Sequence, residues 1–179
     1  STVMASELHV DSIKHSGGTS ALTIDSSGNV HKAGFVVQTS FHTFTDITSV
    51  TSSSYADVGG SSFTFTPKFA SSLLHITASV HAYIYRSSDD NGGSVDINVD
   101  GSNISASGDA REFFLQVGGA SALYIFNRLH KEVTVSATNT SSKTIKLQMQ
   151  NNTSADSGGF RINDGSNYTS SIKVEELAQ

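Results

Sequence analysis

The chain has 179 residues, with 16 acidic and 11 basic side chains, a net charge of −5 and no cysteine. The basic residues are scattered, which argues against nucleic acid as a partner because phosphate binding requires clustered Lys and Arg. No apolar run approaches the ~20 residues that cross a bilayer, so we expect no membrane insertion. The absence of cysteine excludes disulfides, thiol catalysis and Cys-based zinc sites. A chain rich in Ser, Thr and Gly, with 10 Phe and 5 Tyr, favours strands over helices.

The first 34 residues are predicted to form a separate, extended arm that carries a β-hairpin. Residues 20–32 read SALTIDSSGNVHK, in which apolar and polar residues alternate on either side of a Ser-Ser-Gly-Asn turn. So small a hairpin cannot bury its own apolar face, and we expect it to dock on another surface. The apolar residues predicted to make that attachment are Val10, Ile13, Leu22, Ile24 and Val30. Gly34 is the expected hinge to the rest of the chain.

Residues 35–179 are predicted to form one β-rich head. A long strand is expected over Phe35–Ile47, and the strongest two-residue period covers Leu73–Tyr85. The even-numbered residues of that second strand form an apolar face, which is typical of a central antiparallel strand. A loop is expected over residues 87–93.

Shorter strands are predicted throughout the head: around residues 55–58, 63–66, 95–99, 113–117, 122–129, 133–137, 145–149, 160–162 and 172–177. No window holds the apolar stripe of an amphipathic helix. Strands at this spacing predict an all-β fold, a jelly-roll-type β-sandwich.

The N-terminal segment ELHVDSIKHSGGTSALTIDSSGNV resembles a run found at the start of tail-fibre and other virion proteins of tailed bacteriophages, especially marine phages and cyanophages. The matching residues are Val10, Asp11, Ile13, Gly18–Ser27, Gly28 and Val30. The head is similar in pattern to the heads of such fibres, which are TNF-like jelly rolls, on residues 55–67, 73–85 and 172–177. The resemblance implies a non-enzymatic homotrimer at the virion surface that contacts other virion proteins.

No catalytic constellation is visible. The chain has no GxSxG elbow and no phosphate-binding glycine loop. Glu175 and Glu176 are neighbours on a strand and point to opposite faces, so they cannot act together as acid and base. We therefore expect no enzyme activity and no cofactor.

Two histidines lie on one face of the Leu73–Tyr85 strand. His75 and His81 are about 20 Å apart by strand geometry, so a single subunit cannot bind one metal ion with both. Around a threefold axis, three copies of either residue would form a ring that holds an ion or weakens on protonation near pH 6. The simpler interpretation is a sheet surface packed against a neighbouring subunit without metal, and we expect no metal site.

The adjacent Phe113 and Phe114 must face opposite sides of their strand. One is expected to enter the sandwich core and the other to be covered by a neighbouring subunit, so that replacing either with Asp would dissociate the oligomer. A second set of residues suits sugar binding, because aromatic faces stack on apolar sugar faces. Its members are Tyr83, Tyr85, Arg86, Tyr124 and Tyr168, for which core or interface packing is the simpler alternative.

The sequence thus predicts a structural protein at the virion surface. Within this class, a tail fibre or receptor-binding tip competes with a capsid decoration protein. The alternative from another class is a stand-alone carbohydrate-binding module, which would be monomeric and would bind a host surface glycan without the first 34 residues. A hydrolase has no motif to support it.

Overall fold

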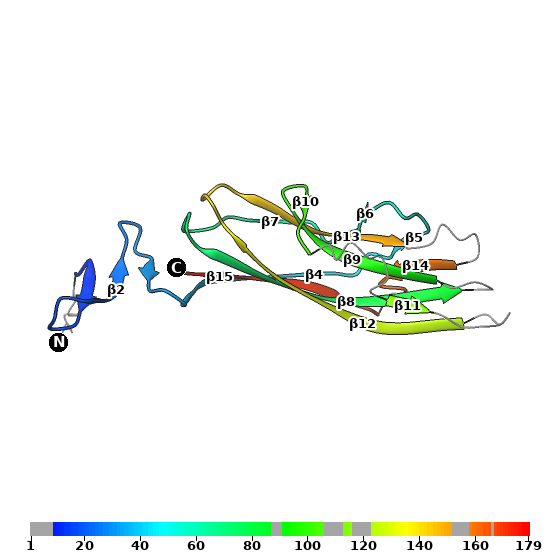
Figure 1. The fold of residues 1–179 in the computed structure, drawn as a ribbon, viewed down its shortest axis with the longest axis horizontal. Coiled ribbons are helices and arrows are strands. Elements are labelled where there is room, and N and C mark those ends of the chain that lie inside the picture. The colour runs from blue at the N-terminus through cyan, green and yellow to red at the C-terminus, as the bar shows by residue number, and fades with distance from the viewer. Residues whose placement is uncertain (1–8, 87–90, 106–112, 116–122, 152–157, 166) are drawn as a thin grey trace, which may run out of the picture.

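The computed structural model describes the chain except for residues 1–8, 87–90, 106–112, 116–122, 152–157 and 166 (Figure 1). All regular structure in the described residues is β, with no helix, as the sequence predicts. The strands are β1 (Ser12–Lys14), β2 (Ser20–Ile24), β3 (Val30–His31), β4 (Val36–Phe44), β5 (Thr48–Val50), β6 (Ala56–Asp57), β7 (Phe63–Phe65), β8 (Leu73–Arg86), β9 (Asn91–Val99), β10 (Ser102–Asn103), β11 (Phe113–Leu115), β12 (Leu123–Ser136), β13 (Lys143–Asn151), β14 (Gly158–Ile162) and β15 (Ser170–Leu177).

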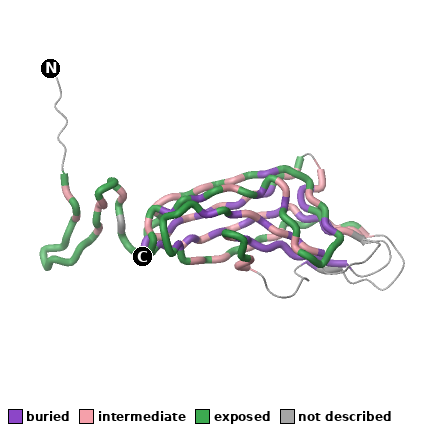
Figure 2. Tube along the Cα trace, turned by 90° about the horizontal axis from the view of Figure 1, so that it is seen from above, coloured by how far each residue is buried: buried purple, intermediate pink, exposed green. Residues whose placement is uncertain are grey.

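The arm forms its own small antiparallel sheet, in the order β1-β2-β3. The turn of the predicted hairpin is held by Asp25, whose carboxylate accepts hydrogen bonds from the backbone N–H groups of Ser27 and Asn29. Gly28 supplies the positive φ of 79° that this turn requires. The arm projects from one end of the head and is largely exposed along its length (Figure 2). A sheet of this size has no core of its own.

The head consists of two sheets, which we call sheet B and sheet C. In sheet B, β8 is central: β12 pairs along one side, while β15 and β14 share the other side and are flanked in turn by β4 and β5. In sheet C, β9 and β13 are central, with β10 and β11 beside β9 and with β6 and β7 beside β13. All of these pairings are antiparallel.

The two sheets enclose one hydrophobic core. From β8 it takes the alternating residues predicted to be apolar, and all six are at most 1% exposed: Leu74, Ile76, Ala78, Val80, Ala82 and Ile84. Sheet C supplies Val95, Ile97, Ile145, Leu147 and Met149. The described residues therefore form a β-sandwich, in which the outward residues of β8 are left on the surface of sheet B.

The start of β9 differs from the prediction of a loop over residues 87–93. The strand begins at Asn91, and Gly93 pairs with Phe113 of β11. A Cβ atom at Gly93 would lie 2.4 Å from the ring of Phe160, which packs there from sheet B. Glycine is needed at this position because an aromatic ring approaches the backbone closely, and not because the chain turns.

The segment from 122 to 137 also differs from its prediction as two strands. It is one strand, β12, paired with β8 from Leu123 opposite Arg86 to Ser136 opposite Leu73. The apolar period breaks at Asn127 and Lys131, which lie opposite core-facing alanines of β8. Polar residues on the inner side are characteristic of an edge strand, where they discourage pairing with another chain.

Candidate functional site

The outer face of sheet B brings together both histidines and the four tyrosines that the sequence singles out. It consists of the outward residues of β8 and, directly opposite them, those of β12. His75 and His81 both lie on this face, which agrees with their predicted positions on one side of a strand. The described residues contain no group of three or more His, Asp or Glu side chains that could hold a metal ion.

Aromatic rings gather on the part of this face that lies farthest from the arm. We call this group the aromatic cluster; its members are His81, Tyr83, Tyr85, Tyr124, Phe126 and Tyr168. The ring centroids of Tyr83 and Phe126 are 4.8 Å apart, and those of Tyr85 and Tyr124 are 4.9 Å apart. Tyr124 and Phe126 nevertheless remain 55% and 51% exposed. The cluster is thus a group of contacting rings, of which Tyr124 and Phe126 are the most open to solvent.

The cluster has a charged border on the β14 side. The Arg161 guanidinium lies over the ring of Tyr83, 5.6 Å from its centroid, and pairs with the Asp164 carboxylate at 3.0 Å. Burial, reinforced by the negative charge of Asp164, raises the pKa of the Tyr83 phenol. The phenol of Tyr83 is therefore neutral, and its buried ring lies beneath the more exposed rings of the cluster.

His81 packs against two rings of the cluster, those of Phe126 and Tyr168. Its ring stacks on that of Tyr168 with centroids 3.7 Å apart and planes inclined by 11°. Its Nδ1 atom is buried and has no hydrogen-bond partner among the described residues. Burial, together with the positive charge of Arg128 on β12, lowers the pKa of the imidazole. Both effects favour the neutral ring.

His75 has the opposite surroundings. Its Nε2 lies 2.9 Å from a carboxylate oxygen of Glu132, and its Nδ1 lies 3.4 Å from one of Glu175. Glu175 also pairs with Lys173 at 3.0 Å, and its pKa is lowered chiefly by that hydrogen bond. The half of the face nearer the arm is therefore ionic, whereas the far half is aromatic.

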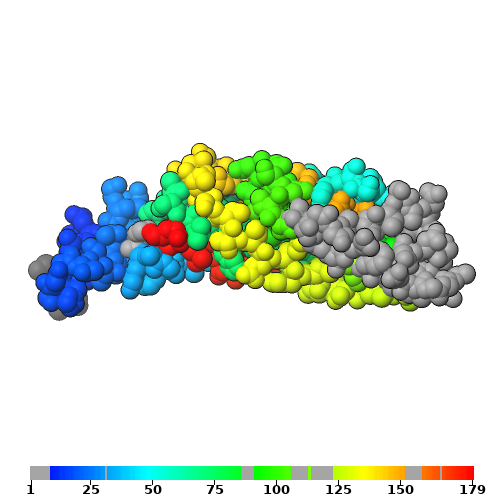
Figure 3. All heavy atoms as spheres, viewed as in Figure 1, coloured from blue at the N-terminus to red at the C-terminus, as the bar shows by residue number. Residues whose placement is uncertain are grey.

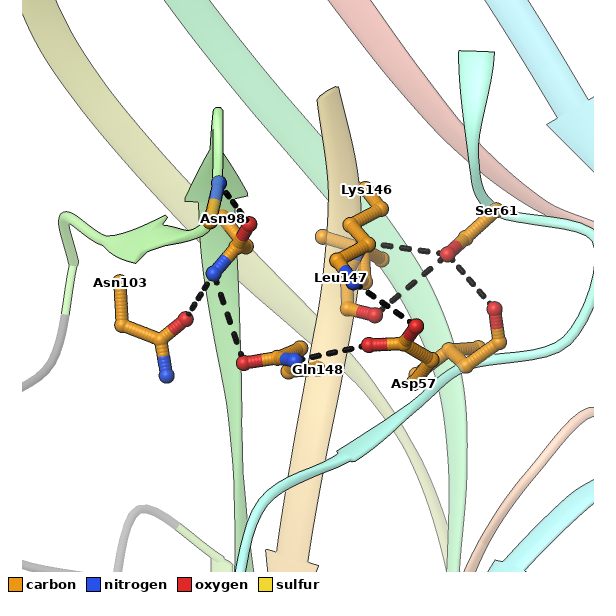
Figure 4. A network of polar contacts seen from close by, with 9 residues as sticks. Asp57, Ser61, Asn98, Asn103, Lys146, Leu147 and Gln148 are labelled. Carbon is orange, nitrogen blue, oxygen red and sulfur yellow. Dashed lines mark hydrogen bonds and ion pairs between the residues drawn. The ribbon is translucent and has the colours of Figure 1, made fainter. Parts of the chain in front are cut away.

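The outer face of sheet C is polar, and most of its side chains bond to one another, although the buried Asp96 Oδ2 has no partner among the described residues. Figure 4 shows side-chain amides forming a ladder across its strands: Asn98 donates to Asn103 and Gln148, and Gln148 donates to Asp57 at 2.7 Å. Lys146 completes the row with a 2.8 Å ion pair to Asp57, a contact that lowers the pKa of this carboxyl. A face whose polar groups already bond to one another offers little apolar area to a partner.

The arm residues are less buried than those of the head. Ile13 and Val30 are 48% and 45% exposed, although they pair with Leu22 and Ile24 of β2. The remaining predicted attachment residue, Val10, is half-buried and precedes β1. Figure 3 shows the arm, in blue, beyond the end of the head at which the C-terminal residues, in red, emerge. The arm is thus placed to reach a surface outside the head.

Where the arm meets the head, its last residues form backbone hydrogen bonds with the C-terminal residues. The Gly34 N–H donates to the Ala178 carbonyl at 2.8 Å, and the Ala178 N–H donates to the Phe35 carbonyl at 2.9 Å. Phe35 and Val36 are about half exposed here and line a shallow pocket between arm and head, close to Val30.

Phe113, one of the two adjacent phenylalanines, lies in the core. Phe113 is 9% exposed and packs edge-on against Phe160 in the core, as expected for one member of the pair. We therefore correct the expectation for Phe113→Asp, which should unfold the head because the charge would enter the core. The side chains of Phe114 and Arg86 lie outside the described residues.

Phe126 belongs to the cluster but was not singled out from the sequence. It lies two residues from Tyr124 and directly opposite Tyr83, so recognising β12 as one strand paired with β8 would have found it. No helix in the described part of the chain is long and apolar enough to span a membrane. No known protein family matches the chain, and no curated protein matches it.

Proposed function

We propose that this chain is a non-enzymatic structural protein on the surface of a tailed-phage virion, and that it acts as a homotrimer. The head, residues 35–179, packs against its copies, and the arm, residues 1–34, attaches the trimer to other virion proteins. The observation that carries the proposal is the aromatic cluster on one outer face, in which Tyr124 and Phe126 are about half exposed, opposite a face whose side chains are polar. The phage assignment is supported by the resemblance of the arm sequence.

The strand order supports a jelly-roll head. The first and last strands of the sandwich, β4 and β15, are neighbours, and the chain repeatedly crosses from one sheet to the other. A jelly roll likewise has two sheets joined by Greek-key connections, although each of its sheets has four strands and each sheet here has six.

The face of sheet B is better suited to self-association than its edge. The inward Asn127 and Lys131 make β12 a poor template for another strand. Covering a large apolar side chain completely contributes about 1.5–3 kcal/mol, so burying Tyr124 and Phe126 in each of three subunits is a substantial driving force. Threefold symmetry then repeats each contact.

The oligomeric state tests this proposal. Sedimentation equilibrium of the full chain at pH 7.5 should give a trimer, and Phe126→Asp should give a folded monomer, because Phe126 is half exposed within one subunit. Ile47→Asp is the matched control: Ile47 is 59% exposed, lies between β4 and β5, and should leave the trimer intact. A wild-type monomer, or a trimeric Phe126→Asp variant, would contradict the proposal.

Two positions on the virion remain as proposals, a tail fibre and a capsid decoration protein. Cryo-electron microscopy of whole virions, with density fitted by the elongated head, distinguishes them directly. Absence of this density from both tail and capsid would refute both.

Carbohydrate binding is a second candidate function, favoured by one observation. Tyr83, Tyr85, Tyr124 and Tyr168 come together beside the Arg161–Asp164 ion pair, which combines stacking surfaces with polar groups. A cluster covered by a second copy is closed to a sugar, so the two functions compete for one surface. Glycan-array binding by the full chain that is lost in Tyr124→Ala would favour the sugar.

A further inference from the structure

We infer that His81 makes the association between copies sensitive to acid: the aromatic cluster packs against a neighbouring subunit while His81 is neutral and releases it when His81 is protonated. This inference rests on the proposed function, because it concerns regulation of the same surface. The partner is a second copy of this chain.

The first argument is the environment of the two ring nitrogens. The buried Nδ1 of His81 has no partner among the described residues. In a neutral ring with its proton on Nε2, Nδ1 presents only a lone pair, and this costs little. A protonated ring must place an N–H at Nδ1 as well, and a buried N–H without an acceptor costs much more than a buried lone pair.

The second argument is the set of charges around the ring. Arg128 lies directly opposite on β12, held in place by hydrogen bonds from its guanidinium to the Ser79 hydroxyl and the Thr169 carbonyl. The acid that faces the ring is Asp164, from the turn after β14, and its carboxylate is already paired with Arg161. A positive charge on His81 would therefore lie near the Arg128 cation and near the Asp164 carboxylate, whose negative charge Arg161 already balances.

The third argument is the coupling of His81 to the contact surface. Its ring stacks on Tyr168 and also contacts Phe126, the half-exposed centre of the cluster. A charged ring gains free energy by turning its Nδ1 toward water, and this movement breaks the parallel stack with Tyr168. The surface offered to a second copy then loses its fit.

The direction of the pH effect follows from the lowered pKa of His81. Assembly removes still more water from the ring, so the assembled state binds fewer protons than the free subunit. Association is then complete above the pKa of His81 in the free subunit, which is itself below the ordinary 6.5, and weakens as pH falls through that lowered value. Each pKa unit by which assembly lowers the value in one subunit weakens association about tenfold per subunit.

His75 provides an internal comparison on the same strand face. Both of its ring nitrogens lie beside carboxylates, those of Glu132 and Glu175. His75 lies outside the aromatic cluster, whereas His81 stacks within it. This difference separates the proposed mechanism from a general effect of low pH on histidines.

The test is sedimentation equilibrium of the full-length protein at pH 7.5 and pH 5.0. We expect wild type and His75→Gln to be trimers at pH 7.5 and monomers at pH 5.0. His81→Phe, which keeps a stacking ring without a titratable nitrogen, should be a trimer at both. His81→Gln is a second non-titrating variant if Phe disturbs folding, which circular dichroism reports.

Each outcome is decisive. A wild-type trimer at both pH values overturns the inference and leaves the proposed function standing. Dissociation of both His81 variants into monomers at pH 5.0 has the same consequence. A wild-type monomer at pH 7.5 overturns the proposed function, and the inference with it. In addition, NMR titration of the His81 ring proton should give a midpoint below 6.5, and a midpoint at or above 6.5 contradicts the mechanism.

Discussion

Replacing Glu176 with Gln, which exchanges one carboxylate oxygen for an NH2 group, should strongly destabilise the head. Glu176 lies near the end of β15 and is fully buried. Its carboxylate accepts hydrogen bonds from the backbone N–H groups of Lys68 and Phe69, each at 2.9 Å, from the Ser72 hydroxyl at 2.7 Å and from the Gln38 amide at 2.6 Å. The segment it holds is the crossover from β7 of sheet C to β8 of sheet B.

The magnitude follows from the donors that Gln cannot satisfy. A Gln side chain has one acceptor oxygen and one NH2 group, so in either orientation it turns a donor toward other donors. Two of the bonds to Glu176 are lost or strained, and hydrogen bonds to charged groups contribute about 1.5–3 kcal/mol each. We expect a loss of about 3 kcal/mol in the free energy of unfolding, or roughly 6–12 °C in Tm.

Urea denaturation at a fixed protein concentration measures this loss, because any coupling to association is then constant.

Burial alone would raise the pKa of Glu176, but its hydrogen bonds outweigh burial and lower the pKa below the ordinary 4.5. Its stabilising contribution is therefore complete above pH 4.5 and is lost as pH falls through the lowered value. The difference between wild type and Glu176→Gln should shrink at pH 3.

The matched control is Glu175→Gln, one residue earlier on the same strand. Glu175 faces outward and pairs with Lys173 and His75, and such surface ion pairs contribute little to the free energy of unfolding. If Glu176→Gln were as stable as Glu175→Gln at pH 7, the carboxylate would not be holding the crossover and the reasoning would be refuted.

Three further changes test the fold. Gly93→Ala should cost about 1–3 kcal/mol by forcing the backbone from the Phe160 ring, whereas Gly159→Ala, with no atom nearer than 3.9 Å, should change Tm little; equal melting temperatures would contradict the packing at Gly93. Phe113→Asp should unfold the head, seen as loss of the thermal transition, and a folded monomer would instead restore its assignment to a subunit interface. Deletion of residues 1–34 should leave the head with an unchanged Tm but abolish its incorporation into virions, and normal incorporation would exclude the arm as the attachment device.

The sequence predicts well those parts of the fold that local pattern determines. The alternation along β8 identifies every core-facing residue of that strand, because one face meets the core and the other does not. The Asp100-Gly101 turn is equally local: both residues have positive φ, at 50° and 88°, as a two-residue hairpin loop requires. The arm hairpin is found for the same reason.

What the sequence does not predict depends on residues that are distant along the chain. An inward Glu176 contradicts the rule that charges lie outside, and its donors come from positions 38 and 68–72. Asn98, buried on the outer side of β9, donates to Gln148 of β13, which lies 50 residues further along the chain. The aromatic cluster needed the pairing of β8 with β12, which neither strand shows alone.

The junction at Gly34 and Ala178 also determines how the molecule bears a mechanical load. The arm leads into β4, which runs antiparallel to β15 with paired residues from Leu177 and Val36 to Ser170 and Phe44. A head gripped by its neighbours and pulled by its arm is therefore loaded along β4, in shear against β15. The ladder hydrogen bonds between these strands must then break together rather than one after another, so tension is borne by the whole length of the sheet.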